Sequence, residues 1–127
     1  MTVRNLARAT AWIMLAVIVV LSLVPPLVRP TTRIPHYLEH AAAFSLTGMA
    51  FGVAYLGYQR WLLNMGAVAF CAAIEFAQLM VPGRHARVKD FVVDAVAACI
   101  GISAGPLMIR WTGRHTLRSN HIESMES

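Results

Sequence analysis

Charged side chains are scarce in this chain of 127 residues: aspartate, glutamate, lysine and arginine together make up 13%. That is about half their share in ordinary soluble domains. Apolar residues make up 57%, and the mean hydropathy is +0.58. A soluble protein of this size could not bury so much apolar surface. The composition therefore excludes a soluble domain and indicates an integral membrane protein.

Cysteine is equally scarce. The only two, Cys71 and Cys99, each lie near the middle of an apolar segment, where a thiol commonly serves as a small hydrophobic group. They do not form a disulfide framework, and neither a CxxC nor an HExxH pattern is present. The sequence therefore predicts no cofactor and no metal site. The weaker alternative is a metal ion bound by His36, His40, Glu75 and Asp90.

Four apolar segments separate the few polar stretches, at about residues 9–24, 40–58, 61–81 and 91–111. Each approaches the roughly 20 residues that span a bilayer as a helix. Lipid requires every backbone polar group to be bonded internally, and the segments lack the alternation of barrel strands. We therefore expect an all-α bundle of four antiparallel transmembrane helices over residues 1–111. Residues 112–127 are polar and aperiodic, which predicts a disordered cytoplasmic tail.

The first segment resembles a signal peptide, because Arg4 and Arg8 precede its apolar run. No small-x-small cleavage site follows, however, and Pro25 and Pro26 come where the run ends. Proline removes a backbone donor and clashes with the preceding turn, so it ends or kinks a helix. We expect an uncleaved helix that stays in the membrane.

The net charge of +5 does not indicate nucleic-acid binding, because the basic residues flank the apolar segments. With the N-terminus inside, six are cytoplasmic: Arg4, Arg8, Arg60, Arg110, Arg114 and Arg118. Five are outside: Arg29, Arg33, Arg84, Arg87 and Lys89. This small bias predicts that both termini are cytoplasmic.

Small residues mark possible helix contacts. Gly48 and Gly52 form one GxxxG motif, and Gly101 and Gly105 form another. Such spacing lets helix backbones approach closely in lipid. We expect these motifs to pack helices together within one chain, while an oligomer remains open.

Polar residues gather at three of the expected helix ends, and an antiparallel order brings these ends to one membrane face, the outer one. They are His36, Glu39 and His40, then Glu75 and Gln78, then Asp90 and Asp94. Spacings of three and four place each set on one helix face. Ionisable groups within membrane spans are costly and usually have a functional or pairing reason.

These residues predict a polar site formed by His40, Glu75, Gln78, Arg84 and Asp90. Arg84 would contact an anion, Glu75 or His40 would transfer a proton, and Gln78 and Asp90 would orient them. The expected partners are membrane lipids, including an anionic lipid or a lipid-linked envelope precursor. One alternative is an accessory membrane subunit whose polar cluster only stabilises the bundle. A small transporter is disfavoured, because four helices leave little room for alternating access.

The same residues resemble the signature of VanZ-like membrane proteins, in which an acidic-x-x-Gln pattern leads into a Pro-Gly-Arg turn and an Asp opens the last helix. The matching stretches are Ser22–Pro25, Leu38–His40 with Phe44 and Gly48, Ile74–Gln78, Val81–Arg87 and Asp90–Asp94. The chain departs from it in four places. His36-Tyr37 stands where Asp-Lys is common, Phe44 where tyrosine is common and Asp94 where asparagine is common, and Ala97 or Ala98 replaces a glycine that is usual in the last helix.

The resemblance implies a small multi-pass protein of the bacterial inner membrane. The family's namesake is associated with low-level resistance to the glycopeptide antibiotic teicoplanin. The resemblance thus implies a cell-envelope role that involves a lipid or a glycopeptide-related ligand, and it identifies no reaction.

Overall fold

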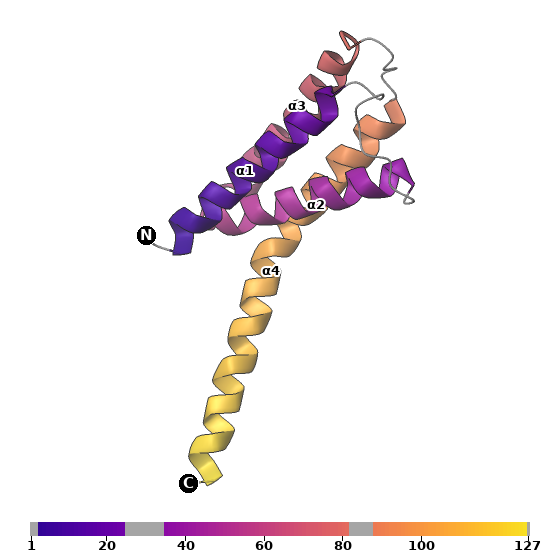
Figure 1. Ribbon diagram of the computed structural model, residues 1–127. Coiled ribbons are helices and arrows are strands. Elements are labelled where there is room, and N and C mark those ends of the chain that lie inside the picture. The colour runs from indigo at the N-terminus through magenta and orange to yellow at the C-terminus, as the bar shows by residue number, and fades with distance from the viewer. Residues whose placement is uncertain (1–2, 25–34, 82–87, 127) are drawn as a thin grey trace.

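The computed structural model describes residues 3–24, 35–81 and 88–126, and all secondary structure in this part of the chain is helical (Figure 1). The four helices are α1 (Val3–Leu23), α2 (His36–Ala54), α3 (Arg60–Gln78) and α4 (Val88–Glu126). The all-α prediction and its four helices are therefore confirmed.

Three stretches within these helices are long and apolar enough to cross a membrane: Arg4–Leu23, Arg60–Gln78 and Val88–Trp111. The length and apolarity that a membrane span needs are therefore confirmed for three of the four expected segments, while four antiparallel transmembrane helices stay a prediction. Among the described helices, α2 does not qualify. It carries Glu39 and His40 near its start, and small or hydroxyl-bearing residues further along. It packs extensively on α4 and, to a lesser extent, on α1.

The two GxxxG motifs face each other where α2 meets α4. An added Cβ at any of the four glycines would collide with backbone of the other helix; at Gly105 it would come within 2.6 Å of the Met49 carbonyl oxygen. The facing pairs are Gly48–Ala98, Gly52–Ile102, Gly101–Ser45 and Gly105–Met49. Residue numbers rise together along both helices, so α2 and α4 run in the same direction. The prediction of close packing within one chain is confirmed.

A proline contributes to this contact. Pro106 lies inside α4 and has no N–H, so the carbonyl of Ile102 one turn earlier lacks its usual helical donor. That carbonyl is the group that faces Gly52. Glycine Cα–H groups serve as weak donors at such helix contacts. The crossing therefore brings Gly52 against a carbonyl that its own helix leaves unbonded.

Aromatic and cationic side chains mark the end of α2 and the turn into α3. The Trp12 indole N–H donates to the Tyr55 hydroxyl at 3.0 Å, and the Arg8 guanidinium lies 5.1 Å from the centre of the same ring. Gly57 provides the turn with a φ of +97°, which favours glycine. Amphipathic rings and cations of this kind are typical of a membrane interface.

Helical backbone continues in α4 to Glu126, well past Trp111, where the apolar part ends (Figure 1, yellow). The polar, aperiodic sequence of residues 112–127 predicts a disordered cytoplasmic tail. Their side chains and residue 127 lie outside the described part of the chain, so the domain boundary at residue 111 stays a prediction.

The glycine contact predicts a clear difference between two alanine substitutions. Gly101→Ala forces a methyl group into the Ser45 backbone and should lower the free energy of unfolding by about 1–3 kcal/mol. Gly66→Ala, where an added Cβ meets open space, should leave it unchanged or raise it by up to ~1 kcal/mol. Denaturant titration in mixed micelles measures both, and equal effects would contradict the close contact.

Candidate functional site

A buried histidine–carboxylate pair connects α2 and α4. His40 Nδ1 lies 3.1 Å from Asp94 Oδ2, and the two residues are 8% and 4% exposed. His40 is one of the predicted site residues, but the carboxylate predicted to orient it was that of Asp90 and not that of Asp94. The pair forms near the start of both helices, on the N-terminal side of the glycine contact.

The imidazole of His40 is held by two neighbours. Its ring stacks on Phe44, with centroids 6.0 Å apart and planes 20° from parallel. When Nδ1–H donates to Asp94, the carboxylate also determines the tautomer, as in a base and its orienting acid. The other carboxylate oxygen, Asp94 Oδ1, is buried and has no hydrogen-bond partner among the described residues. An unpartnered buried acceptor of this kind could bond a donor from a ligand.

Gln78 connects the other two helices. Its side-chain amide donates to the main-chain carbonyl of Ser22 at 3.3 Å, and both residues are buried. The end of α3 is thereby tied to the end of α1. The structure therefore gives Gln78 a helix-positioning contact.

Of the remaining predicted residues, two lie on described helices, and the side chains of the others lie outside what the structure describes. Glu75 is half-buried on α3 and makes a further interaction, as does His40. Asp90 is half-buried in the first turn of α4, one turn before Asp94. Arg84 and the side chain of His36 lie outside the described residues, so the anion contact of Arg84 stays a prediction. Within the described residues, no group of three or more His, Cys, Asp and Glu side chains could hold a metal ion.

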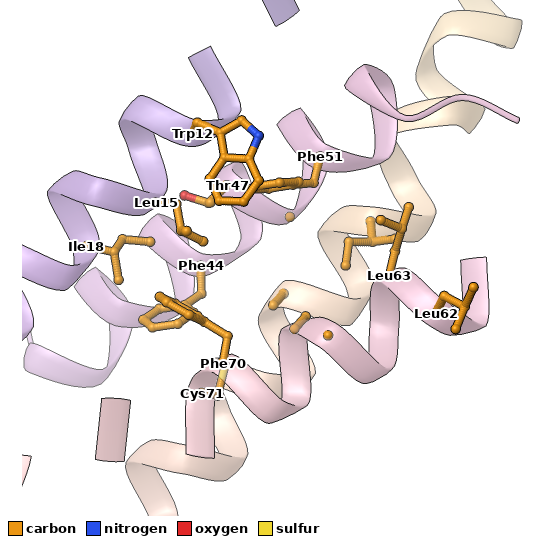
Figure 2. Close-up of a pocket in the computed structure, with 15 residues that line it drawn as sticks. Trp12, Leu15, Ile18, Phe44, Thr47, Phe51, Leu62, Leu63, Phe70 and Cys71 are labelled. Atoms are coloured by element: carbon orange, nitrogen blue, oxygen red, sulfur yellow. The ribbon is translucent and has the colours of Figure 1, made fainter. Parts of the chain in front are cut away.

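An apolar cavity adjoins the pair through Phe44. Its volume is about 330 Å³, and residues from all four helices line it, with most of the large side chains coming from α1, α2 and α3 (Figure 2). Phe44 lines the cavity on one side and stacks on the His40 ring on the other. This cavity is not predictable from the sequence, because it depends on how four helices pack.

Comparison with protein families, with characterised proteins and with solved structures finds no match for this chain. The resemblance to VanZ-like proteins therefore stays a prediction. The function has to be inferred from the buried pair and its surroundings.

A double-mutant cycle tests the pair. His40→Asn and Asp94→Asn should each destabilise the protein, and together by less than the sum, because either change alone already removes the interaction. We expect a coupling free energy of about 1–3 kcal/mol, typical of a hydrogen bond to a charged group or a lost buried partner.

Thermal or denaturant unfolding in detergent measures this cycle. Combining His40→Asn with Asp90→Asn is the matched control, since Asp90 lies one turn earlier on the same helix and should not couple to His40. Additive effects of His40→Asn and Asp94→Asn would contradict the pairing.

Proposed function

We propose that the chain is a multi-pass membrane protein of the bacterial cell envelope that binds, and could modify, a lipid or lipid-linked envelope ligand at a polar site near one membrane face. In this proposal all four helices cross the bilayer in antiparallel order, with both termini in the cytoplasm. The observation that carries it is the buried His40–Asp94 pair within an otherwise apolar bundle.

A bundle held together only by apolar packing has no use for such a pair. Burying ionisable groups costs several kcal/mol by most measures, roughly 2.5–3.5 kcal/mol for an aspartate on insertion scales. The unpartnered oxygen of Asp94 adds to that cost. A ligand that donates a hydrogen bond to this oxygen would offset part of it.

The chemistry around the pair suits an anionic headgroup with donors of its own. The start of α4 directs free backbone amides toward this end of the bundle, where anions bind favourably. Arg84 and Arg87 precede that helix in the sequence and would supply positive charge. His40, oriented by Asp94, and Glu75 are the groups that would transfer a proton. A link to glycopeptide resistance follows from the VanZ-like resemblance alone.

A second candidate is a structural or accessory subunit. The polar contacts favour it in one respect: His40–Asp94 joins α2 to α4, and Gln78 joins α3 to α1. Two contacts that fasten the helices in two pairs would be sufficient reason for these polar residues. This account requires no ligand.

Abundance and resistance together distinguish the two candidates. In a bacterial host, Glu75→Gln and Arg84→Ala should leave the membrane abundance of the protein near normal and abolish its effect on teicoplanin susceptibility. The neighbouring, exposed Lys89→Gln is the control and should change neither. Loss of abundance in both Glu75→Gln and Arg84→Ala would instead favour the structural subunit.

The orientation is tested separately by labelling. A cysteine in place of Ala86, in a chain whose Cys71 and Cys99 are replaced by alanine, should react with a membrane-impermeant maleimide added outside the cell. Residue 86 lies in the connection between α3 and α4, which the proposal places on the outer face. Reaction only after the inner face is opened would overturn the proposed orientation.

A further inference from the structure

The apolar cavity beside the polar pair has a lining that selects for hydrocarbon. Its large apolar residues include Trp12, Ile18, Phe44, Phe51, Leu63 and Phe70 (Figure 2). Ala98 and Ile102 of α4 line the side nearest the glycine contact, where they face Gly48 and Gly52. The volume of about 330 Å³ is roughly twice that of an engineered protein cavity that admits benzene.

One polar atom interrupts this lining. Thr47 is 5% exposed, and its Oγ1 has no hydrogen-bond partner among the described residues. A threonine within a helix can bond a carbonyl of its own preceding turn, but Thr47 does not. The hydroxyl is therefore left for a partner that enters the cavity.

Water is a poor occupant of this space. A buried water molecule needs two to four polar partners, and the unpartnered atoms among the described lining residues amount to the Thr47 hydroxyl. The cavity also lies among the helices that are apolar enough to span a membrane. The medium that reaches it there is lipid, and a void of this size left empty would forfeit packing contacts.

The cavity and the polar pair lie along one helix. Thr47 follows His40 by seven residues on α2, or about 10 Å of helix. Phe44 lies between them, against the His40 ring and the cavity alike. A glycerolipid whose headgroup lies at the pair would direct its ester carbonyl and acyl chain along α2, toward Thr47.

We propose that this cavity binds one acyl chain of a membrane glycerolipid, with the Thr47 hydroxyl donating a hydrogen bond to the ester carbonyl. This specifies the ligand class of the proposed polar site and rests on that proposal for the position of the headgroup. The selectivity comes from the carbonyl and from the shape of the cavity, because a chain leaving bulk lipid gains no hydrophobic free energy.

Two substitutions separate these contributions. Gly66 lines the cavity from α3 and is itself exposed, and a Cβ there would meet open space, so the side chain of Gly66→Leu has room to enter the cavity without a backbone collision. Thr47→Val keeps the shape and removes the hydroxyl. Ala69→Leu is the matched control, because Ala69 lies on the same helix, is exposed and is not part of the cavity.

The experiment uses the full chain in vesicles of equal parts diester and diether phosphatidylglycerol with identical chain lengths. After extraction in mild detergent, native mass spectrometry counts the lipids that remain bound. We expect one lipid per chain, with diester preferred about fivefold, the factor that one net hydrogen bond supplies. Thr47→Val should lose the preference, Gly66→Leu should lose the lipid, and Ala69→Leu should keep both.

Retention of lipid by Gly66→Leu, or its absence from the unaltered protein, would overturn the proposal. Equal retention of diester and diether lipid by the unaltered protein would overturn the role of Thr47. A melting temperature for Gly66→Leu at or above that of the unaltered protein shows that its loss of lipid is not unfolding. If the lipid is retained as expected but the protein has no effect on teicoplanin susceptibility, the proposed function is overturned and the lipid-binding cavity is not.

Discussion

The close contact of α2 with α4 is the constraint on which the rest of the structure depends. Four glycines place backbone against backbone along this crossing, which side chains of any size would prevent. The crossing determines which residues near the helix starts meet, and so pairs His40 with Asp94. The composition of α2 is not apolar enough to qualify it as a membrane span. The crossing explains how α2 still packs within the bundle, because α4 and α1 cover it.

The polar pair and the helix contact support each other. A hydrogen bond between buried groups is stronger away from water, but only when both partners are held in place. The glycine contact supplies that rigidity, and the stacked ring of Phe44 limits the rotation of His40. The Gln78 amide meanwhile fixes α3 to α1 at the same end of the molecule. A ligand at this end would therefore meet an arranged set of groups.

Much of the fold could be predicted from hydropathy and glycine spacing, because both act within a single helix. The partner of His40 could not be predicted in this way. Asp90 and Asp94 lie one turn apart on the same face of α4, so only the register of α4 against α2 decides which of them meets His40. Carrying the parallel register of the glycine pairs back toward the helix starts points to Asp94. The cavity was equally unpredictable, because no pattern within one helix reveals a gap that four helices enclose.

The proline in α4 has a mechanical consequence. A helix bends most readily where a main-chain hydrogen bond is missing, and in α4 that position adjoins Gly105, which packs against Met49 of α2. The part of α4 beyond Pro106 extends away from the other helices (Figure 1). A force on that extension would be absorbed as a bend at the proline, so the tilt of the C-terminal arm can change while the bundle above keeps its shape.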